Sequence, residues 1–128
     1  MSRFLRTAVF LFITMLITTS YAQEPIIDNT IMPFFEAMKT GNVQSIGKYL
    51  GEPLSNEVRV LLSDNKNYPN FLRQRYENAS SEVTQVRKLP GGEIIVNLKI
   101  YFPVRATEFL RLRIVENSNG ESKIVEQQ

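Results

Sequence analysis

The stretch EIIVNLKIYF, residues 93–102, decides the fold. Successive side chains of a β-strand point to opposite faces, so alternating polarity marks a strand with one buried face. One face would carry Ile94, Val96, Leu98, Ile100 and Phe102, and the other Glu93, Ile95, Asn97, Lys99 and Tyr101. The sequence therefore predicts a long strand that presents a continuous apolar face to a core.

Further alternating segments accompany this strand. They are residues 82–89, 108–116 and 122–127, and the connections are residues 90–92 (Pro-Gly-Gly), 103–107 and 117–120 (Asn-Ser-Asn-Gly). Gly, Asn and Pro in such short connections favour tight turns between neighbouring strands. We therefore expect an antiparallel meander in the C-terminal half.

The N-terminal half carries helical patterns. After a polar lead over residues 23–29, apolar residues recur at the spacing of one helical face, namely Ile31, Phe34, Phe35 and Met38. A start at Asn29 or Thr30 would place Pro33 in the first turn, where the missing amide costs nothing. Gly41 suits a left-handed helix end, and Asn42 can cap a second helix at once.

The second helix would turn Val43, Ile46, Gly47 and Leu50 inward and end at Gly51 and Pro53. A third helix is expected from Pro69 onward. Between them Val58, Val60 and Leu62 alternate, so residues 54–62 are predicted to form a short strand. Helices followed by a meander indicate an α+β domain whose helices pack on one face of the sheet.

The first 22 residues have the pattern of a cleavable signal peptide. Arg3 and Arg6 precede the short apolar run 8–17, and Ser20 and Ala22 are the small residues that a cleavage after Ala22 requires. The run is shorter than the roughly 20 residues of a membrane span, so no stable membrane anchor is expected. We therefore expect residues 23–128 to form one domain that is exported, either periplasmic or secreted.

Charge and composition restrict the partners and the chemistry. The full chain has 15 basic and 13 acidic residues, so loss of Arg3 and Arg6 would leave 13 of each. A formal charge of zero gives no reason to expect nucleic acid as a partner. His and Cys are absent, and these are the commonest ligands of transition metals. We therefore expect no metal site and no cofactor.

Three short motifs are shared with β-lactamase-type serine hydrolases. They are Lys-Thr-Gly at residues 39–41, Ser-Ile-Gly-Lys at 45–48 and Ser-Asp-Asn at 63–65. In those enzymes Lys-Thr-Gly comes last, whereas here it comes first. Helix capping and turn formation explain the same residues. The motifs therefore predict no catalytic residue.

The order of elements resembles the nuclear-transport-factor-2-like (cystatin-like α+β) superfamily, especially its small exported bacterial members of unassigned function. The resemblance rests on residues 35–42 (FEAMKTGN), 112–115 (LRIV) and 120–126 (GESKIVE), and would cover about residues 26–127. It implies a cone-shaped domain, in which a curved antiparallel sheet wraps around the helices and leaves an apolar pocket. Superfamily members use that pocket as an enzyme site, a ligand site or a core, and many dimerise through the sheet. A homodimer through the sheet is therefore a further expectation.

The resemblance also raises an enzymatic alternative. Members that resemble ketosteroid isomerases place a carboxylate base beside hydrogen-bond donors in the cone. Here Glu36 or Glu77, with a Tyr donor, would have to serve in a small isomerase or dehydratase. Helical periodicity places Glu36 outward, so we prefer a non-enzymatic domain.

Two groups of side chains are candidates for binding. Six aromatic residues could line a pocket for a small apolar ligand, or could instead fill the core: Phe34, Phe35, Tyr49, Phe71, Tyr76 and Tyr101. Lys99, Arg111 and Arg113 could form a basic stripe for an anionic partner, or could be balanced by Glu93, Glu108 and Glu116. The prediction is an exported domain that binds a small apolar ligand in its cone or a protein partner on its sheet.

Overall fold

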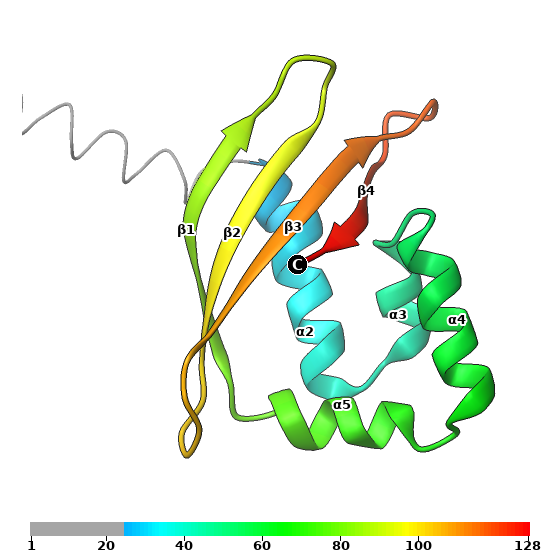
Figure 1. Ribbon diagram of the computed structural model, residues 1–128, viewed down its shortest axis with the longest axis vertical. Helices are drawn as coiled ribbons and strands as arrows, with labels where there is room; N and C mark the ends of the chain where they lie inside the picture. Colours follow the sequence, from blue (N-terminus) through cyan, green and yellow to red (C-terminus); the bar gives the residue numbers. More distant parts are fainter. Residues whose placement is uncertain (1–24) are drawn as a thin grey trace, which may run out of the picture.

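The computed structural model describes residues 25–128, and the leader predicted over residues 1–22 lies outside them (Figure 1). The helical elements are η1 (Ile27–Ile31, a π-helical turn), α2 (Met32–Thr40), α3 (Val43–Lys48), α4 (Leu54–Asp64) and α5 (Tyr68–Tyr76). The strands are β1 (Ser80–Lys88), β2 (Ile94–Tyr101), β3 (Glu108–Glu116) and β4 (Ser122–Gln127), in the antiparallel order β1-β2-β3-β4. The predicted α+β class, with helices before an antiparallel meander, is confirmed.

The helices and the sheet form two layers. Figure 1 shows α2 lying along one face of the sheet, α5 across its lower end, and α4 on the side of the molecule away from β1. We call the face that α2 covers the inner face, and no helix of residues 25–128 covers the outer face in this view. None of the described helices has the length and apolar character that crossing a bilayer requires.

The core lies between these layers. Val96, Leu98 and Ile100 of β2 are at most 1% exposed, as are Leu112 and Ile114 of β3. Cross-strand pairing sets Val96 against Leu112 and Ile94 against Ile114, so the apolar faces of the two strands are continuous. The predicted inward face of the stretch 93–102 is thus confirmed.

The helical hairpin follows the predicted capping pattern. Gly41 ends α2 in the left-handed conformation, with φ of 69°, and the Asn42 side chain accepts the amide of Ser45 at 3.1 Å. A Cβ atom on Gly41 would lie 2.4 Å from the carbonyl oxygen of Pro69. Glycine is therefore required both for the backbone angle and for the close approach of α5.

The predicted strand over residues 54–62 is wrong, because this segment is the helix α4. Leu54, Val58 and Leu62 are half-buried, at a spacing of four residues, whereas Val60 is 51% exposed. Three alternating residues fit a strand, but the apolar residues at 54, 58 and 62 fit a helical face equally well. Tertiary packing favours the helical spacing.

The predicted polar lead over residues 23–29 is also wrong from Pro25 onward. Ile26 and Ile27 are buried, and the chain is already helical there. The amide of Met32 bonds to the carbonyl of Ile27, five residues back. This wide turn precedes Pro33, which has no amide hydrogen to offer.

The second helix is shorter than predicted, since α3 ends at Lys48. Gly47 is exposed rather than inward. Leu50 is buried as predicted, but it lies in an extended segment beside β4. There the amide of Ile124 bonds to the carbonyl of Tyr49 at 2.7 Å, and the amide of Gly51 bonds to the carbonyl of Ile124 at 2.8 Å. This segment protects part of the outer edge of β4.

Candidate functional site

The six aromatic candidates do not gather around one cavity. Phe34 and Phe35 are each 2% exposed and belong to the core. Tyr49 and Tyr76 are half-buried against that core. Phe71 is exposed on α5, where its ring stacks on that of Tyr68 at 6.3 Å between centroids, and Tyr101 lies on the outer face of the sheet, among the exposed hydrophobic residues.

An apolar cavity of about 40 Å³ does lie among the helices. Its lining consists of Phe34, Met38, Ile46, Leu50, Leu54, Val58, Tyr68, Leu72 and Gln127. Phe34 is thus the one aromatic candidate in the lining. A cavity that admits benzene measures about 150 Å³, and typical ligand pockets start near 300 Å³. The packed helices leave little room for a ligand.

The two carboxylates of the enzymatic alternative point away from the core. Glu36 lies 3.7 Å from Lys39 and Glu77 lies 3.6 Å from Arg73, with both carboxylates well exposed. The outward direction predicted for Glu36 is confirmed. Within residues 25–128, the carboxylate that a tyrosine hydroxyl reaches is Glu82, which accepts from Tyr101 at 2.5 Å on the exposed sheet surface.

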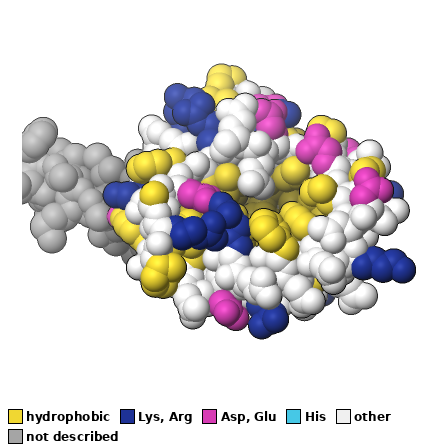
Figure 2. Space-filling view, turned by 60° about the horizontal axis from the view of Figure 1, so that its bottom comes forward, with side chains coloured by type: hydrophobic (Ala, Val, Ile, Leu, Met, Phe, Trp, Pro, Cys, Tyr) yellow, Lys and Arg dark blue, Asp and Glu magenta, His cyan; other side chains and the backbone are white. Residues whose placement is uncertain are grey.

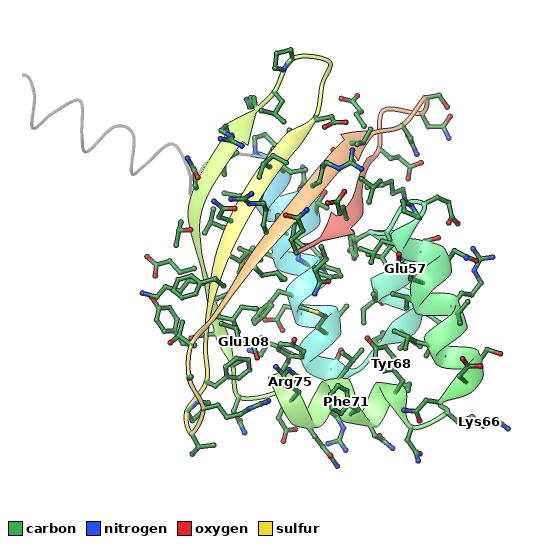
Figure 3. The ribbon with its side chains drawn as sticks, viewed as in Figure 1. Glu57, Lys66, Tyr68, Phe71, Arg75 and Glu108 are labelled. Atoms are coloured by element: carbon green, nitrogen blue, oxygen red, sulfur yellow. The ribbon has the colours of Figure 1, made fainter. Side chains whose placement is uncertain are left out.

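A cationic and aromatic cluster joins the two layers at the lower end of the sheet. Figure 3 shows Arg75 of α5 facing Glu108 of β3, with which it forms an ion pair. The Arg75 guanidinium also lies 5.6 Å from the ring centroid of Tyr76 and 5.7 Å from that of Phe102. A hydrogen bond with Tyr76, and then the Glu108 carboxylate, raise the pKa of Arg75 above its usual value. This cluster ties α5 to the sheet and is half-buried, so we assign it a structural role.

The outer face of the sheet carries a different arrangement. Lys99 of β2 lies between two aromatic rings, with its Nζ 5.2 Å from the Tyr101 centroid and 5.9 Å from the Phe109 centroid. Phe109 is 74% exposed. Arg111 follows two residues later on β3, on the same face. We call Lys99, Tyr101, Phe109 and Arg111 the basic–aromatic patch.

The cations of this patch are not neutralised by neighbouring carboxylates. Among the described residues, no Asp or Glu lies within ion-pair distance of Lys99 or Arg111. Glu82 stands opposite Lys99 across the strands but accepts its hydrogen bond from Tyr101. Arg111 donates through Nε to the Asn97 side chain at 3.3 Å, which orients the guanidinium and leaves its charge unpaired.

Arg113, the third residue of the predicted basic stripe, is balanced. It pairs with Glu93 at 3.0 Å and with Glu126 at 3.2 Å. Glu93 was among the predicted balancing residues, but Glu108 pairs with Arg75 instead. The stripe is therefore divided into an end at Arg113, where carboxylates offset the cation, and a cationic end at Lys99 and Arg111.

A shallow hollow adjoins the patch on the sheet. It measures about 320 Å³, and its lining consists of Thr84, Asn97, Leu98, Phe109, Leu110, Arg111 and Gln128. Arg111 and Gln128 exchange both backbone hydrogen bonds, at 3.0 and 2.9 Å, so the end of the chain forms one wall. Figure 2, in which the lower end of the molecule comes forward, shows hydrophobic side chains beside Lys and Arg on that end.

The sequence could name Lys99, Tyr101 and Arg111 but missed Phe109. Alternation along residues 108–116 already placed Phe109 with Arg111 and Arg113 on the polar face. The pairing of Lys99 with Phe109 was the missing information, because register between two strands is not visible in either strand alone.

The basic–aromatic patch brings two cations and two aromatic rings together on the outer face of the sheet. In residues 25–128 no cluster of three or more Asp or Glu is placed to hold a metal ion. Comparisons with protein-family models, curated proteins and solved structures found no match for this chain.

Proposed function

We propose that this chain is a non-enzymatic binding module whose basic–aromatic patch binds a protein segment carrying acidic and apolar side chains. The observation that carries the proposal is the exposed Phe109 beside two cations, Lys99 and Arg111, that have no carboxylate partner. Aromatic and Arg side chains dominate the energetics of protein interfaces. An aromatic ring that remains so exposed in the free domain gains most from being covered.

The alternative for such a face is a solvated surface, which would leave Phe109 exposed to water and Lys99 and Arg111 without a partner. Arg113, on the same face, is already paired with Glu93 and Glu126. The patch concentrates aromatic area and positive charge in one place. An acidic segment would neutralise Lys99 and Arg111, and its apolar side chains would cover Phe109 and enter the adjoining hollow of about 320 Å³.

The experiment is a titration of the protein with a fluorescent peptide of alternating Glu and Leu, read as anisotropy. A peptide with Lys in place of Glu is the comparison. We expect the acidic peptide to bind, the basic peptide not to bind, and added salt to weaken the binding. Arg111→Glu should lower the affinity at least about tenfold.

Lys48→Glu provides the matched control. Lys48 is exposed on α3, far along the chain from the patch, and its reversal changes the net charge by the same amount as Arg111→Glu. We expect Lys48→Glu to keep nearly the affinity of the unaltered protein. Equal binding of both peptides, or equal losses in the two variants, would overturn the proposal.

Two further parts of the proposal concern relationship and location. We infer a distant relation to the nuclear-transport-factor-2-like superfamily, supported by the helical hairpin and the following meander; an experimental structure with a sheet that does not bend around α2 would oppose it. We also infer export, supported by the pattern of residues 1–22. Mass spectrometry of the protein recovered from its host should then find Gln23 as the first residue, whereas an intact N-terminal leader would contradict export.

A further inference from the structure

Helix α4 carries a surface stripe whose chemistry complements the basic–aromatic patch. Glu57, Val60, Leu61 and Asp64 follow the spacing i, i+3, i+4 and i+7, which places them along one side of the helix. All four are exposed, Val60 to 51% and Leu61 to 45%. We call these four residues the acidic stripe of α4; Figure 3 labels Glu57 on this helix.

The stripe is as unpartnered as the patch. Within the described residues, neither Glu57 nor Asp64 has a cation within ion-pair distance. The neighbouring Arg59 is held by Glu52 at 3.0 Å, and Lys66 lies beyond the end of the helix. The stripe therefore presents an acidic residue, two aliphatic side chains and a second acidic residue in sequence along the helix.

The dimensions of the two surfaces agree. Seven residues of α-helix separate Glu57 from Asp64 by about 10 Å along the axis. Lys99 and Arg111 occupy diagonal positions on neighbouring strands, which are roughly 7–8 Å apart. Their long side chains can spread to meet the two carboxylates, while Val60 and Leu61 would then lie over Phe109, which neighbours both cations.

We propose that the acidic stripe of α4 in one copy docks on the basic–aromatic patch of a second copy. This inference rests on the proposed function of the patch and names one occupant for it. A chain does not bring its own stripe to its own patch, because α4 lies on the side of the molecule away from β1 and β2 (Figure 1). Each surface is small, so the association is reversible and depends on protein concentration.

The test combines two double charge reversals in sedimentation velocity experiments. Glu57→Lys with Asp64→Lys removes the stripe, and Lys99→Glu with Arg111→Glu removes the patch. We expect the unaltered protein to associate as its concentration rises and each reversed protein to remain monomeric. A mixture of the two reversed proteins should associate, because each supplies the surface that the other has lost.

The control for the stripe reversal is Glu36→Lys with Glu77→Lys, because it changes the net charge by the same amount and in the same direction. These exposed carboxylates lie on α2 and just after α5, outside both surfaces, so this variant should associate as the unaltered protein does. Circular dichroism checks that all variants are folded. The inference fails if the unaltered protein stays monomeric or if the mixture of reversed proteins does not associate. It also fails if the stripe-reversed protein still associates, because that result would indicate that two copies pair through their sheets.

Failure of this inference is distinguishable from failure of the proposed function. The stripe-reversed protein still has its patch, so the acidic peptide should bind it as tightly as before. Peptide binding without self-association would overturn only the α4 docking. Loss of specificity for the acidic peptide would overturn the role of the patch, and the docking with it.

Discussion

At the scale of single residues, Gly41 is the position where the backbone allows the least freedom. Its φ of 69° disfavours any side chain, and a Cβ atom would lie 2.4 Å from the carbonyl oxygen of Pro69. The left-handed conformation costs a residue with a side chain roughly 1–2 kcal/mol, and the contact requires α2 and α5 to separate. We expect Gly41→Ala to lower the free energy of unfolding by about 2–4 kcal/mol, measured by urea denaturation.

Gly47 supplies the control for the same substitution. It lies inside α3, and a Cβ atom there would meet nothing within 4 Å. Because Ala favours the helix over Gly, Gly47→Ala should raise the free energy of unfolding by about 0.5 kcal/mol. Equal effects of the two substitutions would show that Gly41 is not in the strained turn described.

Tyr68 makes the stability depend on alkaline pH. Burial, and then the nearby Tyr76, raise the pKa of its hydroxyl above the usual value of 10.0. The folded chain therefore holds this proton more tightly than the unfolded chain does. The resulting stability is complete below about pH 10 and is lost as the pH rises through the folded pKa.

This loss of stability at alkaline pH can be checked by comparing the unaltered protein with Tyr68→Phe. The free energy of unfolding of each protein is measured from pH 8 upward. The unaltered protein should lose stability more steeply above about pH 10, because phenylalanine has no proton to release. Parallel profiles of the two proteins would contradict a raised pKa for Tyr68.

At the scale of secondary-structure elements, α4 offers a direct test of helix against strand. Val58 is half-buried and Val60 is exposed, although both would share one face in a strand. Val58→Ala should cost about 1 kcal/mol through lost burial. Val60→Ala should change the free energy of unfolding by no more than about 0.5 kcal/mol. Equal costs, read from urea denaturation, would favour a strand.

The elements that could be predicted from sequence are those in which one periodic pattern persists over many residues, or in which specific residues cap a helix. The alternation over residues 93–102 and the pairing of Gly41 with Asn42 gave β2 and the helical hairpin, and the bounds of β3 and β4 agree with the alternation there. The error at α4 arose because a segment with three alternating apolar residues satisfies both periods. The early start at Ile26 and Ile27 depends on burial against distant elements, which no local pattern contains.

The candidate site was less predictable than the fold. Lys99 and Arg111 could be named because alternation assigns them to the polar face. Their separation from Arg113 could not, since Glu126 of β4 is a partner that only cross-strand register identifies. Whether the six aromatic residues line a pocket or fill the core could not be predicted, because sequence gives their number but not their directions. Tyr101, for example, lies on the opposite face of the sheet from Phe34.

At the scale of the whole molecule, burial is distributed unevenly. The inner strands β2 and β3 contribute side chains that are at most 1% exposed, and α2 contributes four buried residues. Helix α4 has eleven residues and none of them is buried. Segments with little buried apolar area open locally, at a free energy below that of global unfolding. We therefore expect the helix that carries the acidic stripe to open locally at a lower free energy than β2 and β3.

Native-state hydrogen exchange checks this distribution. We expect the amides of α4 to exchange through local openings that change little with added urea, whereas those of β2 exchange only through global unfolding and so respond steeply to urea. Helix α2 is the matched control, because it is a helix of similar length whose Phe34 and Phe35 are in the core; its amides should follow β2. If α4 exchanged only by global unfolding, its packing on the other helices would be as strong as the packing of α2 on the sheet. In that case α4 would present the acidic stripe in a fixed geometry. Exchange through local openings, the expected result, means that α4 can adjust to the patch of the second copy as it docks.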